Sequence, residues 1–509
     1  GDIEACSIEV QATRTVTIAS GHTLIASNEA TTLGTPATTN LIFQNTASLI
    51  QLNNAVNSGS IRYIRNATPM VRNDYTYWSS PVAGQVLNVF SPLTNPSRYY
   101  VFDNTSYNWL CVPGASTMIP AKGYIIRARS NYSTSATTTY VGQFVGVPNN
   151  GDYSIPIVVN TIPNPIQDRN LIGNPYPSAI DADLLLAANL TTLQGSFYFW
   201  THNTPITNNV YTANDYAVYN QSGGTATAIN SGINNNPPNQ FIAAGQGFFV
   251  QGLNSGTLTF TNAMRVAGNN ASFFRNSQQN TTVTREKHRV WLNLINTQGA
   301  FKQLLAGYIQ EATNAMDNHF DSEIAEAGNS ISFYSVLEDK KLTIQGRSLP
   351  FMETDIVPLG YRATYAGTYA IQLADFDGLF ALGQAIFLED KLLSVVHDLR
   401  TSNYEFTTAI GTVEDRFVLK FQNETLSIPE VSLQNIIVIK NQNTIDITAS
   451  STITLKEVKV FDMRGRLITS LDNINSFTAK VTNLNIANQV LLVQITDVEG
   501  KTVTKKLVY

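Results

Sequence analysis

Apolar and polar side chains alternate with a period of two through most of this chain, and Asn, Gly, Pro or Ser interrupts the alternation about every 8–12 residues. This alternation gives each strand one apolar face, and short strands between regular turns are typical of sandwiches and barrels. Helical spacing is scarce, and its best examples are residues 310–328 and 181–195. The pattern predicts an all-β protein of several tandem β-sandwich or jelly-roll-like domains, ending in a small immunoglobulin-like sandwich.

The composition limits the partners that we expect. Of 509 residues, 43% are hydrophobic and 14% are charged, so the chain can bury large cores. The net charge of -5 gives no positive surface for nucleic acid. No apolar run reaches about 18 residues, so we expect no transmembrane segment. Gly1 is preceded by neither Met nor a signal peptide, which predicts a processed or truncated start.

Turn residues and composition predict four domains. They are an N-terminal β region at 1–70 (a solenoid edge or one sandwich sheet), a pseudo-duplicated β domain at 71–277, a β-sandwich at 278–426 and a C-terminal domain at 427–509. Polar stretches at 269–282 and 423–430 mark two of the breaks, the second with Pro429.

Residues 71–277 carry three motifs twice in the same order. The first copy reads "YTYWSSPVAGQVL", "SRYYVFD" and "MIPAKGYIIRARS"; the second reads "LIGNPYPSAIDADLLL", "GSFYFWTHN" and "FIAAGQGFFVQG". Pro81 and Pro177 stop strand pairing in the turns, while Gly123 and Gly247 indicate a bulge or a close backbone approach. We therefore predict two equivalent halves, with "YWSSP" and "GNPYP" at matching positions.

The aromatic residues of these copies have two interpretations. Repeated aromatics usually form a core, because each buries a large apolar area. The alternative is an exposed platform for sugar rings. The exposure of six residues distinguishes the two: Tyr77, Trp78, Trp109, Tyr198, Phe199 and Trp200.

No motif indicates catalysis, a cofactor or a metal, so we expect a non-enzymatic protein with none of these sites. "GQGFFVQG" at 245–252 leads into a strand rather than a helix, and "EGKT" at 499–502 lacks the upstream Gly of a phosphate loop. The histidines form neither HxH nor HExxH, and no CxxC occurs. Cys6 and Cys111 allow one disulfide, which the sequence does not decide. Two carboxylates from distant strands of 71–277 could still form a hydrolase site.

The final domain contains two similar turns and a basic terminal strand. Asp462 to Gly465 and Asp497 to Gly500 each place Gly where a hairpin turn favours positive φ. In "VTKKLVY", alternation assigns side chains to two faces: Val503, Lys505, Leu507 and Tyr509 on one, Thr504, Lys506 and Val508 on the other. An unpaired buried Lys is costly, so we expect the lysines near solvent.

Two stretches of this domain, "LKEVKVFDMRGRLITS" and "NLNIANQVLLVQITDVEGKTVTKKLVY", resemble the C-terminal sorting domain of type IX secretion substrates from Bacteroidota. Many members have Gly-x-Tyr where this chain has Asn488, Gln489 and Val490. The resemblance implies that the sorting signal comprises Asp462, Gly465, Gly500, Lys501, Lys505, Lys506, Leu507, Val508 and Tyr509. Upstream stretches, among them "IPAKGYIIRA", are similar to parts of large flavobacterial surface proteins.

The resemblance implies an exported, adhesin-like protein on the extracellular face of the outer membrane. Its implied partners are the type IX translocon, an outer-membrane shuttle β-barrel and surface glycans. The alternative is a set of carbohydrate-binding modules from a secreted polysaccharide-active enzyme. A structural explanation of the basic strand also exists: it completes the last sheet, and its lysines discourage edge-to-edge aggregation.

Overall fold

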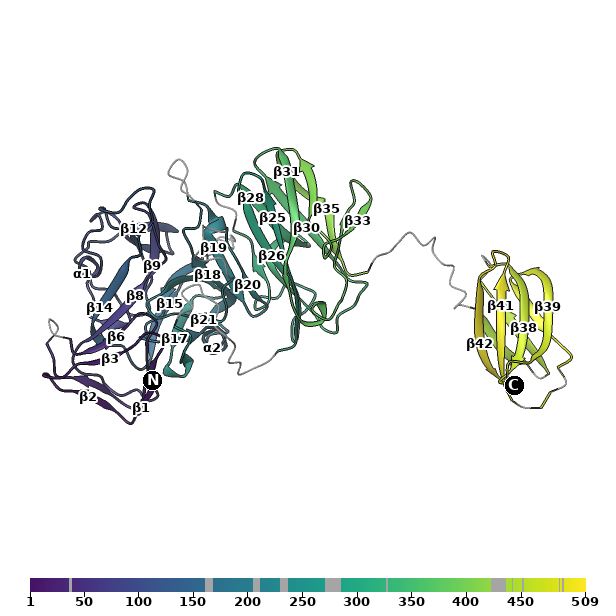
Figure 1. Cartoon of the computed structure of the whole chain (residues 1–509), viewed down its shortest axis with the longest axis horizontal. Helices are drawn as coiled ribbons and strands as arrows, with labels where there is room; N and C mark the ends of the chain where they lie inside the picture. The colour runs from purple at the N-terminus through teal and green to yellow at the C-terminus, as the bar shows by residue number, and fades with distance from the viewer. Residues whose placement is uncertain are drawn as a thin grey trace. The chain divides into compact units, whose positions relative to one another are not determined.

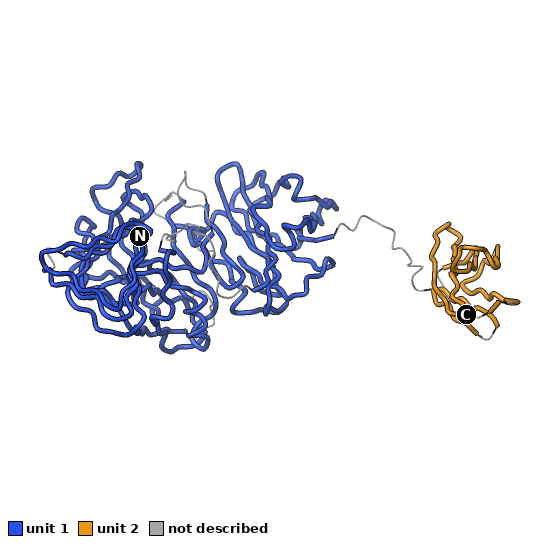
Figure 2. Tube along the Cα trace, turned by 60° about the horizontal axis from the view of Figure 1, so that its bottom comes forward, with its two compact units in different colours: residues 1–422 blue, residues 423–509 orange. Residues whose placement is uncertain are grey.

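The computed structural model consists mainly of strands, which confirms the all-β prediction (Figure 1). It describes residues 1–509 except 36–38, 161–167, 205–210, 229–236, 271–284, 326–327, 423–435, 442, 451–452, 485 and 488. The chain forms two compact units, residues 1–422 and 423–509 (Figure 2). The expected break at 423–430 lies outside the described residues, as does most of the one at 269–282.

The N-terminal strands stack in parallel as a β-solenoid rather than a sandwich sheet. They are β1 Ile3–Ala5, β2 Ile8–Val10, β3 Val16–Ile18, β4 Thr23–Ala26, β5 Ala30–Thr32, β6 Leu41–Phe43, β7 Ser48–Gln51 and β8 Ile61–Asn66. Their columns are β1-β4-β7, β2-β5 and β3-β6-β8. The third column continues into β14 (Val141–Pro148) and β10 (Val82–Ala83), so one sheet extends across residue 70.

The two copies that follow repeat one sheet topology. The first contains β9 Tyr75–Trp78, α1 Leu87–Phe90, β11 Tyr99–Asp103, β12 Asn108–Cys111 and β13 Tyr124–Arg127. The second contains β16 Arg169–Gly173, α2 Ala182–Ala188, β18 Leu193–Trp200, β19 Tyr216–Asn220, β20 Gly223–Thr225 and β22 Gly247–Gly252. The order β9-β13-β11-β12 therefore corresponds to β16-β22-β18-β19, to which β20 is added.

Smaller sheets flank the second copy. Strand β15 (Tyr153–Ile157) pairs with β23 (Gly256–Phe260), and β17 (Ala179–Asp181) lies between β21 (Phe241–Ile242) and β24 (Arg265–Val266).

Strand register defines which residues of the two copies correspond. Trp78 pairs with Tyr124 in the first copy, and Ile172 pairs with Phe248 in the second. Tyr124 and Phe248 correspond, because each directly follows the matching glycine of its copy, Gly123 or Gly247. Their partners Trp78 and Ile172 therefore correspond too. Three residues further along each copy, Pro81 corresponds to Pro175, so "SSP" matches "GNP". The match of Pro81 with Pro177 that the sequence predicted is therefore wrong by two residues.

Reciprocal backbone hydrogen bonds join the two copies. The Ser79 amide donates to the Gly245 carbonyl at 2.8 Å, and the corresponding Gly173 amide donates to the Ala121 carbonyl at 2.9 Å. Ala121 and Gly245 both have positive φ, 65° and 74°. Each copy therefore contributes one amide and one carbonyl, as expected for halves related by an approximate two-fold axis.

The remainder of the first unit is one eleven-stranded sheet. Its strands are β25 Lys287–Asn296, β26 Phe301–Ile309, β27 Ser322–Glu323, β28 Ile331–Leu337, β29 Lys340–Arg347, β30 Ile356–Ala363, β31 Gly367–Phe376, β32 Phe387–Asp390, β33 Val395–Asp398, β34 Tyr404–Thr408 and β35 Gly411–Lys420. Side chains from most of them meet in one core. The Trp291 indole N–H donates to the Gly224 carbonyl at 2.7 Å and so ties this sheet to the second copy.

The second unit is a small antiparallel sandwich, as predicted. Its described strands are β36 Ile437–Asn441, β37 Thr444–Thr448, β38 Leu455–Asp462, β39 Leu467–Ser476, β40 Thr478–Val481, β41 Val490–Asp497 and β42 Thr502–Val508. They form the sheets β36-β37-β40 and β39-β38-β41-β42 around an aliphatic core.

The candidate helical segment at 310–328 forms no helix in its described residues. Its described residues form turns and strand β27, where the Ser322 hydroxyl lies 2.7 Å from that of Ser196 and Asp321 accepts the Gly346 amide at 2.9 Å. These tertiary bonds outweigh a weak local preference for helix. The helix predicted at 181–195 is present only as α2, because β18 begins at Leu193.

Gly123→Ala should destabilise the junction between the copies. A Cβ at Gly123 would lie 2.6 Å from Leu171 Cγ and 2.7 Å from the Ile172 carbonyl oxygen. We expect a loss of about 1–3 kcal/mol in the free energy of unfolding of the first unit, measured by urea titration. The matched control is Gly256→Ala, whose new Cβ would meet its nearest neighbour, in Thr192, at 3.5 Å. An equal loss in both variants would contradict the close-approach explanation.

Candidate functional site

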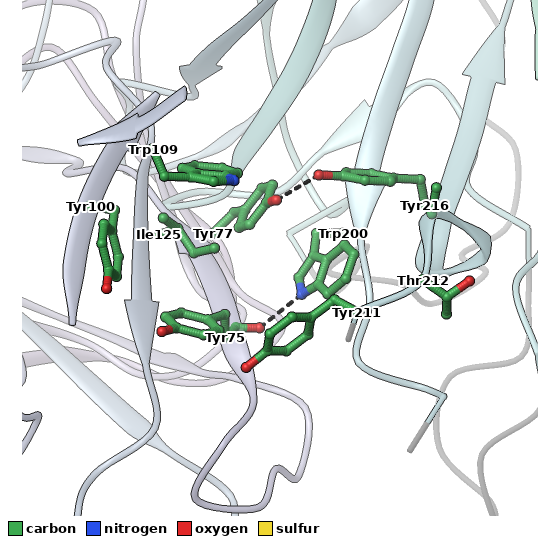
Figure 3. Close-up of a pocket in the computed structure, with 10 residues that line it drawn as sticks. Tyr75, Tyr77, Tyr100, Trp109, Ile125, Trp200, Tyr211, Thr212 and Tyr216 are labelled. Atoms are coloured by element: carbon green, nitrogen blue, oxygen red, sulfur yellow. Dashed lines mark hydrogen bonds between the residues drawn. The ribbon is translucent and has the colours of Figure 1, made fainter. Parts of the chain in front are cut away.

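The facing sides of the two copies enclose a cavity of about 450 Å³, a size typical of small-ligand sites (Figure 3). We call it the aromatic pocket. Its first wall is Tyr75, Tyr77, Tyr100, Trp109 and Ile125; its second is Trp200, Tyr211, Thr212, Ala213 and Tyr216. None of these lining residues carries a carboxylate.

The duplication explains why aromatic residues meet here. Phe102 pairs with Trp109 across β11 and β12, and Trp200 pairs with Tyr216 across β18 and β19. Phe102 and Trp200 occupy corresponding positions on β11 and β18. Their partners Trp109 and Tyr216 therefore correspond as well, and both line the aromatic pocket. The two sheets meet through equivalent faces, whose side chains form one cluster.

Among the positions at which the two copies differ is one beside the pocket, held by Tyr75 in the first copy and by Arg169 in the second. Tyr75 pairs with Arg127, and Arg169 occupies the corresponding place opposite Gln251. The Arg169 guanidinium lies 3.9 Å from the centroid of the Tyr198 ring and covers it. Tyr75 instead meets Tyr100 edge-on, with 6.2 Å between centroids, and leaves that ring facing the cavity.

Ring packing holds the walls in place. Tyr77 stacks on Trp200 at a centroid distance of 5.9 Å and an interplanar angle of 14°, and it lies 5.9 Å from Trp109. Each such pair contributes roughly 0.5–1.5 kcal/mol beyond its buried area. Walls that are ordered before binding reduce the entropy that a ligand must overcome.

Two polar bonds fix the ring orientations. The Tyr77 and Tyr216 hydroxyls lie 2.6 Å apart, and the Trp200 indole N–H donates to the Tyr75 carbonyl at 3.1 Å (Figure 3). Burial raises the pKa of Tyr77 well above its usual value and that of Tyr216 to about 12. Both phenols therefore stay protonated at neutral pH and keep a hydroxyl for hydrogen bonding.

One edge of the pocket is more polar, and we call it the rim. The hydroxyls of Tyr75, Tyr100 and Tyr211 point to the same side in Figure 3. Tyr211 is 39% exposed, and its hydroxyl donates to the Asn73 carbonyl at 2.9 Å. The Tyr100 hydroxyl accepts a bond from Arg98 Nη1 at 2.9 Å.

The six aromatics expected to be informative do not form an exposed flat row. Tyr77, Trp78, Tyr198 and Phe199 are buried, Trp200 is 9% exposed and Trp109 is half-buried. The core interpretation is thus correct for most of them, while three contribute to a pocket that sequence reasoning did not identify. The available signal was the alternation in "YTYW", which puts Tyr75 and Tyr77 on one face and Trp78 on the other.

The residues of the expected sorting signal lie in two hairpin turns and one edge strand. The Asp462 carboxylate accepts the amides of Arg464 and Arg466 at 2.9 and 3.0 Å, and Gly465 has φ of 79°. Asp497 accepts two amides in the same way, including that of Lys501 at 2.9 Å, and Gly500 has φ of 87°. Asp462, Gly465 and Gly500 therefore have a structural role as turn residues.

Strand β42 has two different faces. Val503 and Leu507 pack on the core, Lys505 is half-buried between them, and Tyr509 is 5% exposed with its hydroxyl 3.3 Å from the Leu484 carbonyl. On the other face, Thr504, Lys506 and Val508 are exposed. Lys501 pairs with Glu499 at 3.2 Å.

Other expected features are sparse in the described part of the chain. Cys6 and Cys111 are free and exposed. No group of three or more His, Cys, Asp or Glu side chains there is placed to hold a metal ion. None of the described helices is both long and apolar enough to cross a membrane.

Residues 2–421 match a family described as "Domain of unknown function (DUF8693)". The chain belongs to this family. Residues 426–509 match a second one, "Domain of unknown function (DUF8694)". A comparison with curated proteins gives no match.

Solved structures offer only distant similarities. Tp47, the 47-kilodalton lipoprotein of Treponema pallidum, is 9% identical with a TM-score of 0.14, over 44% of this chain and 87% of that one. The BSP domain of a biofilm-associated protein is 10% identical with a TM-score of 0.12, over 88% and 90%. Similarities at these TM-scores do not establish a shared fold.

Ionisation of Asp215 should lower the free energy of unfolding of the first unit as the pH rises. Asp215 lies in the turn η2 (Ala213–Asp215) beside the pocket, where burial raises its pKa from 3.8 to about 7 although the Thr204 amide donates to it at 3.0 Å. Between these values the folded chain holds a proton that the unfolded chain has released, so raising the pH favours unfolding.

Asp215→Asn retains the acceptor for Thr204 but removes the ionisation. Urea unfolding should show a gain on the order of 1–3 kcal/mol at pH 8 and none at pH 4. Asp339→Asn, at an exposed position, is the control and should change neither value. A gain of equal size at both pH values would contradict the ionisation mechanism.

Proposed function

We propose that this chain is a non-enzymatic, exported cell-surface protein of the type IX secretion pathway in Bacteroidota. Its second unit directs export, through the translocon and an outer-membrane shuttle barrel. Its first unit is adhesin-like and binds an extracellular glycan in the aromatic pocket. The observation that carries the export role is the separate second unit ending in β42, which exposes one face while its other face completes the core.

A second candidate function is a carbohydrate-binding module of a polysaccharide-active enzyme. The aromatic pocket favours it, because ring faces and hydroxyls suit a sugar equally well in an adhesin or an enzyme accessory module. Both candidates predict binding without turnover by this chain. Incubation of the full chain with polysaccharides that it binds should release no more reducing ends than the heat-denatured chain; release above that control would contradict the non-enzymatic proposal.

Charge reversal on β42 should block export without unfolding the domain. The double variant Lys505→Glu/Lys506→Glu keeps Val503, Leu507 and Tyr509 in the core, so the sandwich should still form. In a bacterium with a type IX system, we expect at least a tenfold loss of surface exposure, measured by protease digestion of intact cells, with the protein retained in the periplasm. The factor assumes roughly 1.4 kcal/mol or more of recognition energy.

Lys456→Glu is the matched control, because Lys456 is exposed on β38, a strand of the same sheet that does not pair with β42. It should be displayed normally. Deletion of 501–509 should also be retained, with the first unit folded, although this variant removes core side chains as well as charge. Normal display of the deletion would leave β42 only as a capping strand.

A further inference from the structure

Two arginines at the rim have no acidic partner among the residues that the structure describes. Arg98 precedes β11, and Arg127 ends β13 beside Tyr75. Arg98 donates to the Tyr100 hydroxyl, and Arg127 donates to the Arg72 carbonyl at 3.1 Å and to the Asn73 side chain. Among the described residues neither forms an ion pair, whereas arginines such as Arg347 and Arg416 do.

Their charge reaches the rim of the aromatic pocket. Arg98 and Arg127 both act electrostatically on the hydroxyls of Tyr75 and Tyr211, which lie on that side, and at Tyr211 the carboxyl of Asp74 opposes them. Arg98 is half-buried, and its guanidinium keeps its charge at neutral pH, so it can attract an anionic group placed at the rim.

The chemistry of walls and rim selects a ligand class. Aromatic faces suit the apolar face of a sugar ring, and the hydroxyls of Tyr77, Tyr216 and Thr212 suit its hydroxyl groups. Two guanidiniums disfavour a cationic ligand, although aromatic cages elsewhere bind quaternary ammonium groups. A carboxylate or sulfate gives guanidinium its strongest, charge-assisted bonds.

We infer that the aromatic pocket binds an acidic sugar unit of a polysaccharide, with its ring between the aromatic walls and its carboxylate or sulfate at Arg98 and Arg127. This inference rests on the glycan-binding role proposed above and adds the charge of the ligand. It makes Arg98 the residue that distinguishes acidic from neutral glycans, while the rings supply affinity for either.

The test uses the full chain and two matched pairs of probes in calorimetry. One pair is trigalacturonate and its methyl ester, and the other is a sulfated galactan oligosaccharide and its desulfated form. In at least one pair we expect the acidic member to bind at least about tenfold more tightly, as a charge-assisted bond implies. The pair that responds distinguishes carboxylate from sulfate. The difference should shrink at 0.5 M NaCl, because salt screens charge.

Point variants show which residues produce the preference for the acidic probe. Arg98→Gln should weaken binding of the acidic probe about tenfold and leave the neutral probe unchanged, while Tyr211→Ala should weaken both. Controls in the second unit are Arg464→Gln and Phe477→Ala, both at exposed positions; neither should alter binding. Unchanged far-ultraviolet circular dichroism and unfolding midpoints confirm that each variant is folded.

Three results would overturn the inference in distinguishable ways. Equal affinity for acidic and neutral members, lost in Tyr211→Ala, would remove the charge selectivity but keep the pocket as a glycan site. No binding to any probe, or binding that neither Arg98→Gln nor Tyr211→Ala alters, would remove the glycan site as well. Tighter binding of 4-hydroxybenzoate than of every sugar probe would replace the sugar by an aromatic acid. None of these results bears on export.

Discussion

The architecture of the first unit depends on a pair of reciprocal backbone hydrogen bonds, from Ser79 to Gly245 and from Gly173 to Ala121. Buried amides and carbonyls need partners, and here each copy satisfies the other. The exchange brings the backbones so close that Gly123 and Gly247 leave no room for a Cβ without movement of neighbouring atoms. It also sets which faces of the two sheets meet, and the aromatic pocket follows from that meeting.

A two-fold arrangement of identical halves would give two identical environments, but the two copies differ at several positions, among them Tyr75 and Arg169. Tyr75 leaves the ring of Tyr100 open to the cavity, whereas Arg169 covers the corresponding Tyr198. In the second copy, the cation–π contact between Arg169 and Tyr198 contributes roughly 0.5–2 kcal/mol. The same contact covers a ring face that would otherwise be open to the cavity. The difference at this strand position therefore leaves one ring covered by a guanidinium and the corresponding ring in the pocket wall.

Sequence alone predicted the strands, the sandwich of the second unit and the turns at Gly465 and Gly500, because these depend on local alternation and positive φ. It did not predict the aromatic pocket, since the faces that meet depend on register between segments a hundred residues apart. The same limit explains why the helical spacing at 310–328 forms no helix in its described residues, where Ser322 and Asp321 bond to Ser196 and Gly346. The short solenoid strands left two arrangements open, because parallel stacking has no distinctive period in so few turns.

The two interpretations of the basic terminal strand require different faces of β42. Completing the sheet needs Val503, Leu507 and Tyr509, which face the core. Recognition needs side chains that a partner can reach without unfolding the domain, and Lys506 and Val508 meet this condition. A strand period of two separates these requirements residue by residue. An exposed lysine on an edge strand also opposes aggregation, so Lys506 can protect the free domain whether or not the proposed export role, which requires the same exposed charge, holds.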